Sequence, residues 1–225
     1  MIFAVIAALC TAFIVYSNED MWQAVVEKPR VSVPMNNATG EAVELLATIP
    51  IKGRAPKTEY SRDKFGNGWA SHRGCDTRNV ILYRDLQKPV VNESCLVLSG
   101  TLSDPYTGKT ISFQRGSASS ADVQIDHVVA LGDAWQKGAQ LLSKADRIEL
   151  ANDPLELLAV DGPANQQKSD GDAATWLPPY KPFRCQYVAR QIAVKAKYNL
   201  WMTQAEYDAI LRVLSRCPGQ LLPAA

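Results

Sequence analysis

Small and apolar residues near the end of the chain recur at the spacing of one helical face. They occupy positions i, i+3, i+4, i+7 and i+11: Cys185, Val188, Ala189, Ile192 and Ala196. This pattern predicts an amphipathic helix. Thr203 and Glu206 then form a capping box, which predicts a last helix ending at about Arg216.

The middle of the chain has strand patterns separated by turn residues. Residues 94–102 and 109–114 flank an Asp-Pro-Tyr-Thr-Gly turn and predict a hairpin. The β-rich run 123–131 and the apolar run 155–160 predict two further strands, the second ended by Asp-Gly-Pro.

Shorter helices are predicted before, between and after these strands. A patch at 41–49 places Val43, Leu46 and Ala47 on one side. Asp76 is a candidate N-cap for a helix from Thr77 to Gln87, and Ser143 for one ending at Leu150. Another short helix is expected to carry Asn165 and Lys168.

The N-terminal residues have a different character. Residues 1–18 carry no charged side chain, which indicates an export signal or a membrane anchor. Residues 19–54 then predict a linker and short helix, 55–217 one globular domain and 218–225 a tail. We therefore expect an extracytoplasmic protein, secreted or held at the membrane by residues 1–18.

The composition excludes several classes of protein. A net charge of +1 in 225 residues excludes binding to polyanions through bulk charge. The only histidines are His72 and His127, which excludes a zinc site of three imidazoles.

Charge is nevertheless distributed unevenly. Residues 52–88 hold nine Lys and Arg against four Asp and Glu, residues 181–216 seven against two, and residues 89–180 six against twelve. The pattern suits a polyanion-binding surface around a carboxylate-rich centre, but solvated helix faces explain the same counts.

Four cysteines follow Cys10, and they allow three pairings. The two predicted C-terminal helices place Cys185 at the start of one and Cys217 at the end of the next. Antiparallel packing favours Cys185–Cys217, which leaves Cys75–Cys95. Free thiols in a reducing compartment are the alternative, and no Cys-x-x-Cys motif is present.

The residues that suggest chemistry are Asp126-His127, Asn152, Asn165 and Lys168. Phosphodiester hydrolysis needs a base, a cation and a positive group near the phosphate. Adjacent residues of a strand point to opposite faces, so Asp126 and His127 can share a site only where the strand ends or bulges. A structural histidine is the alternative at His127.

The whole series resembles the HNH, or ββα-metal, endonucleases. The stretches IDHVVALGDAW, ANDPLELLAVDGPANQQKSD and RCQYV, with FGNGWASHRGCDTRN and DPYTGKTISF upstream, resemble an exported branch related to the C-terminal nuclease domain of GmrSD-type restriction enzymes. The resemblance covers residues 55–217. It implies an α+β fold with a ββα-metal core, an N-terminal hairpin and helix extension, two C-terminal helices and two disulfides.

The resemblance also implies roles. His127 would be the general base, Asp126 and Asn165 would hold one divalent metal, Asn152 would orient His127, and Lys168 would lie near the phosphate. Asn165 stands where the commonest pattern has histidine, which favours Mg²⁺, or Mn²⁺, over zinc. The alternatives are Asp126 paired with an Arg, Asn152 as a simple cap or turn residue before Pro154, and Lys168 as a solvated helix residue.

Arg78 and Arg84 are further candidates for DNA contacts, with surface ion pairs as the alternative. Trp69, Trp135 and Trp176 are expected in the core or a pocket wall.

The predicted function is metal-dependent endonucleolytic cleavage of DNA, with RNA as an alternative substrate, by a monomer without an organic cofactor. A non-catalytic nucleic-acid-binding module at the cell surface is the competing hypothesis. No Gly-x-Ser-x-Gly motif is present to indicate a serine hydrolase.

Overall fold

The computed structural model describes residues 42–116 and 120–223. The predictions for residues 1–18 and for most of the linker lie outside this range. The described helices and 3-10 turns are α2 (Ala42–Leu46), η1 (Arg62–Phe65), α3 (Thr77–Asp85), α4 (Leu131–Gln136), η2 (Ala139–Leu141), α5 (Lys144–Asn152), α6 (Gly162–Lys168), η3 (Lys181–Phe183), α7 (Arg184–Lys197) and α8 (Gln204–Leu214). The described strands are β1 (Ser71–His72), β2 (Cys75–Asp76), β3 (Leu86–Val91), β4 (Val97–Ser103), β5 (Thr110–Gln114), β6 (Val123–His127) and β7 (Leu157–Asp161).

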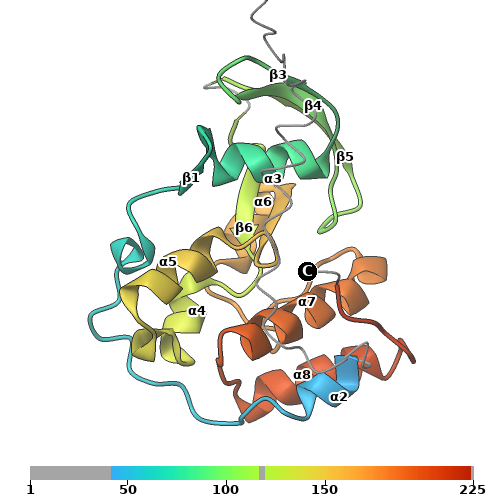
Figure 1. The fold of residues 1–225 in the computed structure, drawn as a ribbon. Helices are drawn as coiled ribbons and strands as arrows, with labels where there is room; N and C mark the ends of the chain where they lie inside the picture. Colours follow the sequence, from blue (N-terminus) through green and yellow to red (C-terminus); the bar gives the residue numbers. More distant parts are fainter. Residues whose placement is uncertain (1–41, 117–119, 224–225) are drawn as a thin grey trace, which may run out of the picture.

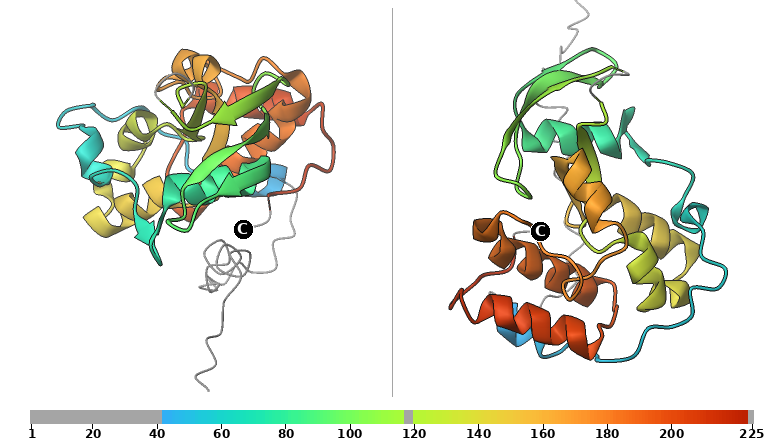
Figure 2. Two further views of the ribbon diagram at one scale, coloured as in Figure 1. Left: turned by 90° about the horizontal axis from the view of Figure 1, so that it is seen from above. Right: turned by 180° about the vertical axis from the view of Figure 1, so that it is seen from behind.

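These elements form a mixed fold of helices and small sheets (Figure 1). The sheet β3–β4–β5 and α3 lie at one end, and α7, α8 and α2 lie at the other. Between them, β6 pairs with β7 and α6 packs on both strands, while α4 and α5 lie to one side. The right-hand view in Figure 2, from behind, shows the same separation into two ends.

The strands of each sheet run antiparallel within the described residues. The predicted hairpin is confirmed as β4 and β5, with Ser99 opposite Gln114. In the central pair, Val123 lies opposite Asp161, and His127, the last residue of β6, lies opposite Leu157. The candidate base therefore lies at a strand end.

The helix predicted to end at Gln87 is shorter than expected. Asp76 caps it as predicted, accepting a hydrogen bond from the backbone N–H of Asn79 at 2.7 Å, but the helix ends at Asp85. Leu86 instead begins β3 and pairs with Leu102. Pro89 cannot continue a helix and is tolerated in this edge strand because it has no N–H to donate.

The apolar face predicted for the first helix is confirmed at Leu46 but wrong at Val43 and Ala47, which are exposed. Val43 is 42% exposed, whereas Ala42 and Leu46, four residues apart, are fully buried. Packing of α2 against α7 and α8 selects this face, which a five-residue helix cannot specify from its own pattern.

The C-terminal helices agree with the prediction. The hydroxyl Oγ1 of Thr203 accepts a hydrogen bond from the backbone N–H of Glu206 at 3.2 Å. Thr203 is therefore the N-cap of α8, as predicted. The disulfides Cys75–Cys95 and Cys185–Cys217 are both present, so the predicted pairing is confirmed.

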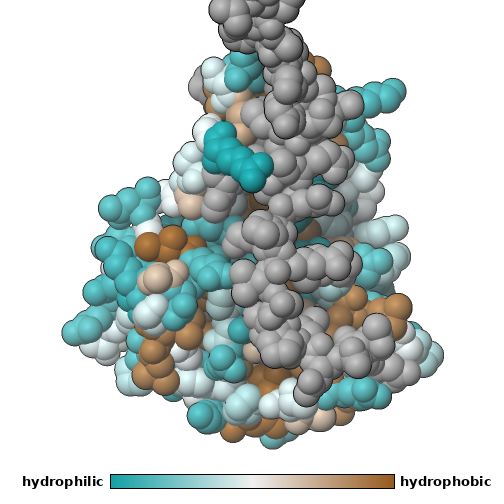
Figure 3. All heavy atoms as spheres, in the orientation of Figure 1, coloured by the Kyte–Doolittle hydropathy of each residue, from teal (hydrophilic) through white to brown (hydrophobic). Residues whose placement is uncertain are grey.

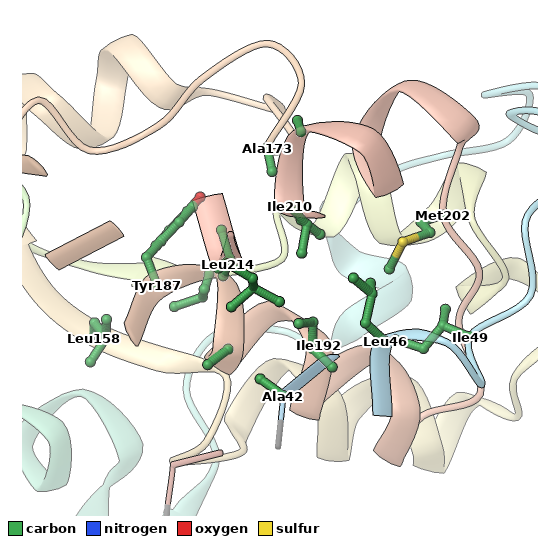
Figure 4. Close-up of a cluster of buried hydrophobic side chains, with 14 of the residues drawn as sticks. Ala42, Leu46, Ile49, Leu158, Ala173, Tyr187, Ile192, Met202, Ile210 and Leu214 are labelled. Carbon is green, nitrogen blue, oxygen red and sulfur yellow. The ribbon is translucent and has the colours of Figure 1, made fainter. Parts of the chain in front are cut away.

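The largest buried cluster joins this helical end to β7 (Figure 4). Ile192 of α7 and Ile210 of α8 face Leu46 of α2, and Tyr187 extends the cluster toward Leu158. On the face drawn in Figure 3, hydrophilic residues surround separate groups of hydrophobic ones. None of the helices in the described part combines the length and hydrophobicity needed to cross a bilayer.

The start of α6 is fixed tightly against β6. Carboxylate Oδ1 of Asp161 accepts a hydrogen bond from the backbone N–H of Ala164 at 2.8 Å, which caps the helix. A Cβ atom at Gly162 would lie 2.1 Å from the carbonyl oxygen of Ala121, so only glycine fits here. This close approach sets α6 directly on the face of β6 that carries Asp126.

Candidate active site

The alternation of β6 divides its polar side chains between two faces. Gln124 and Asp126 contact α6, through Asn165 and Lys168 respectively. The imidazole of His127 instead contacts the end of α5, through Ala151. Its own carbonyl oxygen, however, accepts a hydrogen bond from Nζ of Lys168 at 2.7 Å, so one lysine connects both residues.

Asp126 is buried and has two side-chain partners. Nζ of Lys168 donates to Oδ1 at 2.9 Å, and the hydroxyl of Tyr106 donates to Oδ2. Burial raises the pKa of Asp126 above its usual value, while Lys168 and Tyr106 oppose that rise by stabilising the carboxylate. The side chain of Lys168 is fully buried, so the solvated alternative for this lysine is wrong.

His127 is held by a ring stack and one hydrogen bond. Its imidazole lies parallel to the indole of Trp69, with centroids 5.7 Å apart and planes 6° apart. Nε2 lies 3.0 Å from the carbonyl oxygen of Ala151, which as an acceptor requires the proton on Nε2. Burial, with a smaller contribution from Arg62, lowers the pKa of His127 to about 3 and keeps the ring neutral.

Asn152 makes hydrogen bonds to residues on both sides of the His127 ring stack. It is the last residue of α5, and its Nδ2 donates to the carbonyl oxygen of Ile148 at 2.9 Å. Its Oδ1 accepts a hydrogen bond from the backbone N–H of Ala70 at 2.8 Å. Asn152 thus connects the loop that carries Trp69 to the helix end that binds His127.

Asn165 provides an oxygen suited to a metal. Its Nδ2 donates to Oε1 of Gln124 at 2.9 Å, so the amide is oriented and its Oδ1 has no hydrogen bond among the described residues. Each oxygen of Asp126 accepts one side-chain hydrogen bond and retains a lone pair. A carboxylate and an amide oxygen on packed elements are hard ligands, so this donor set fits a divalent cation such as Mg²⁺.

Glu156 shapes the segment that follows His127. It is fully buried, and its Oε2 accepts a hydrogen bond from the backbone N–H of Val129 at 3.1 Å. Its carbonyl oxygen accepts another from Val128 at 2.9 Å. Burial raises the pKa of Glu156 well above its usual value.

The candidate DNA-binding arginines have internal partners. Arg84 donates to the carbonyl oxygens of Pro154 and Leu157 at 2.8 and 2.7 Å and pairs with Asp85. Arg78 donates to the carbonyl oxygen of Val123 at 3.2 Å. These contacts favour a structural role for both arginines, and contact with DNA stays a prediction.

A second polar cluster lies away from β6. Carboxylates from α4, α8 and the segment after α6 approach closely enough to hold a metal: Asp133, Glu206 and Asp172. The ammonium of Lys137, however, lies 2.7 Å from Asp133, 2.8 Å from Asp172 and 2.6 Å from Glu206. Lys195 and Arg54 also pair with these carboxylates, so three cations balance three carboxylates. The ammonium of Lys137 occupies the position that a metal ion would take among the three carboxylates.

Three residues around the site were not assigned a role from the sequence pattern: Gln124, Tyr106 and Trp69. Gln124 could be predicted from the sequence, because it lies two residues before Asp126 and residues two apart on a strand point to the same face. The sequence pattern around Tyr106 indicates only a turn, and Trp69 is expected only in the core or a pocket wall, so neither pattern points to Asp126 or His127. Trp135 is buried and Trp176 partly buried, as expected.

Comparison with known proteins identifies the family. The C-terminal domain of GmrSD restriction endonucleases matches residues 76–213. The chain therefore belongs to this family of HNH-type nuclease domains. An "Uncharacterized secreted protein" of Arthroderma benhamiae is 35% identical over 192 residues, which cover 84% of this chain and 91% of that protein. No solved structure shows a significant match.

Proposed function

We propose that this protein is an exported, metal-dependent HNH endonuclease that hydrolyses phosphodiester bonds of DNA. One observation carries the proposal. On one face of the β6–β7–α6 unit, Lys168 contacts Asp126 and Asn165 contacts Gln124, while neutral His127 lies at the end of the same strand. In this proposal, the unit serves as the ββα-metal core that the family pattern implies.

His127 acts as the general base that activates water. With Nε2–H donated to Ala151, Nδ1 carries the lone pair that accepts a proton. The stack on Trp69 and the anchoring of that loop by Asn152 hold the ring in one orientation. The neutral ring is thus oriented before substrate binds.

Asp126 and Asn165 would hold one divalent metal, Mg²⁺ or Mn²⁺. When bound, such an ion lowers the pKa of a coordinated water and stabilises negative charge on phosphate oxygens. Lys168 keeps a positive charge next to Asp126 without exposure to bulk water, where its field is weakly screened. The site thereby favours an anionic phosphodiester.

The proposed location is outside the cytoplasm, with the protein acting as a monomer. Disulfides persist in oxidising compartments, and two are formed here. The relative from Arthroderma benhamiae is named as secreted, which supports the same location. Residues 1–18 would then serve as the export signal or as an anchor.

Plasmid nicking by the purified protein tests the catalytic proposal. We expect Mg²⁺-dependent nicking that EDTA abolishes. His127→Ala should lower the rate by about 10²–10⁴-fold because the general base is lost. His72→Ala, which removes the other histidine, is the matched control and should retain activity.

Thermal melting of both variants verifies folding. Binding of plasmid without cleavage would instead identify a non-catalytic module, and a parallel assay with single-stranded RNA decides the substrate. Undiminished nicking by folded His127→Ala would refute the assignment of the base.

A further inference from the structure

Tyr106 is fully buried, and its hydroxyl is directed at a candidate metal ligand. The side chain has no exposed area, and the hydroxyl donates to Oδ2 of Asp126. A tyrosine needed only for packing has no use for a hydroxyl in this position, since burying one without a partner costs free energy. The pairing with Asp126 therefore accounts for the hydroxyl, while the ring accounts for the packing.

The backbone of the turn fixes where that hydroxyl lies. Asp104, two residues earlier, accepts a hydrogen bond from the backbone N–H of Asp161 at 2.9 Å and another from Thr107 at 2.7 Å. The carbonyl oxygen of Tyr106 accepts a hydrogen bond from the backbone N–H of Tyr180 at 2.9 Å. The turn is thus connected to the junction of β7 and α6, the two elements next to Asp126.

The ring is held as firmly as the backbone. Its centroid lies 5.1 Å from that of Trp176, 5.7 Å from that of Tyr187 and 6.2 Å from that of Phe183. Rings packed on several sides leave the phenol few alternative rotamers. The hydroxyl is consequently a preoriented donor.

The two partners of Asp126 come from different parts of the chain. Lys168 reaches Oδ1 from α6, whereas Tyr106 reaches Oδ2 from the β4–β5 turn. Two donors on opposite oxygens fix the plane of the carboxylate. Hydrogen-bonded partners of ligating carboxylates orient them for the metal.

We propose that Tyr106 is a positioning residue that orients Asp126 for binding the divalent cation, an inference that rests on the proposed function. Tyr106 does not touch the reacting atoms and acts through the carboxylate. The β4–β5 hairpin, which lies outside the β6–β7–α6 unit, is therefore part of the metal site.

The test compares two tyrosines that lie in the same aromatic cluster. Tyr106→Phe removes the hydroxyl on Asp126 and keeps the ring. Tyr187→Phe makes the same chemical change in a neighbour that is equally buried, whose hydroxyl accepts a hydrogen bond from Gln191 at 3.1 Å. Mn²⁺ binding to each protein is measured by calorimetry or electron paramagnetic resonance, and plasmid nicking in parallel.

We expect Tyr106→Phe to weaken Mn²⁺ binding by about 10–100-fold. Its kcat should fall while KM for DNA changes little, because the hydroxyl does not contact the substrate. Tyr187→Phe should bind Mn²⁺ within about twofold of the unmodified protein. Unchanged Mn²⁺ affinity in folded Tyr106→Phe, with the unmodified protein active, would overturn this inference alone.

Failure of the unmodified protein to bind Mn²⁺ and to nick DNA would overturn both proposals. If Tyr106→Phe does not fold, the inference is tested instead by nuclear magnetic resonance, as the paramagnetic broadening of tyrosine resonances that Mn²⁺ causes in the unmodified protein. Substoichiometric Mn²⁺ should broaden a ¹³C-labelled tyrosine resonance before the others. Uniform broadening of all tyrosines would contradict a metal beside Tyr106.

Discussion

We expect the buried ammonium of Lys137 to be essential for the thermal stability of the protein. Its side chain has no exposed area and lies within 2.6–2.8 Å of oxygens from Asp133, Asp172 and Glu206. Lys137→Met keeps a flexible apolar side chain of similar length but removes the positive charge. Three buried carboxylates would then share the two remaining cations, Lys195 and Arg54.

The expected loss of stability follows from the burial of the cluster. Removing one partner of a buried ion pair costs about 3–5 kcal/mol, because the other charge is left without compensation. For a domain of this size, about 1 kcal/mol lowers Tm by roughly 2–4 °C, so a cost of about 4 kcal/mol lowers it by about 8–16 °C. Lys57→Met is the control, since Lys57 and Asp170 are each 46% exposed and such pairs contribute at most about 1 kcal/mol.

The pH dependence gives an independent check. Burial alone would raise the pKa of Asp172, but the hydrogen bond and charge of Lys137 lower it below its usual value. In the unmodified protein, Asp172 therefore stabilises the fold at neutral pH, and this contribution is lost as the pH falls through its lowered pKa. Without the hydrogen bond and charge of Lys137, the pKa of Asp172 rises, so lowering the pH from 7 costs the variant less stability than it costs the unmodified protein.

Calorimetric melting of the three proteins from pH 7 to pH 4 measures both effects. The difference in Tm between the unmodified protein and Lys137→Met should shrink as the pH falls. A Lys137→Met variant that melts within about 2 °C of Lys57→Met at pH 7 would refute the reasoning that this ammonium compensates the cluster.

Two further outcomes are expected. Trp69→Leu should reduce nicking by about tenfold or more while Mn²⁺ affinity stays unchanged, because the indole stacks on His127, which is not one of the proposed metal ligands. Equal loss in both assays would contradict this division of roles. The double variant Cys185→Ser, Cys217→Ser removes a disulfide that links residues 32 apart in sequence. The free energy of unfolding, measured with urea, should fall by about 3–4 kcal/mol because the unfolded chain gains entropy. Free thiols at these positions in the native protein would contradict the oxidised state.

Local signals in the sequence predicted many of the elements. The hairpin, the cap of α3 at Asp76 and the Thr203 cap of α8 depend on turn residues and on contacts between near neighbours. The end of α3 was predicted wrongly because Leu86 leaves the helix to pair with Leu102, and the face of α2 because distant helices select it. Helical spacing also placed Cys185 opposite Cys217, since antiparallel helices follow from a short connection.

The sequence by itself predicted a set of candidate site residues, because their types and order resemble the pattern of a known family: Asp126, His127, Asn152, Asn165 and Lys168. Only the tertiary structure decided how they are arranged. Tyr106 reaches Asp126 across 20 residues of sequence, and the partners of Lys137 lie up to 69 residues away. Such contacts depend on how the elements pack and leave no period or spacing in the chain, which is why the surroundings of the site had to come from the fold.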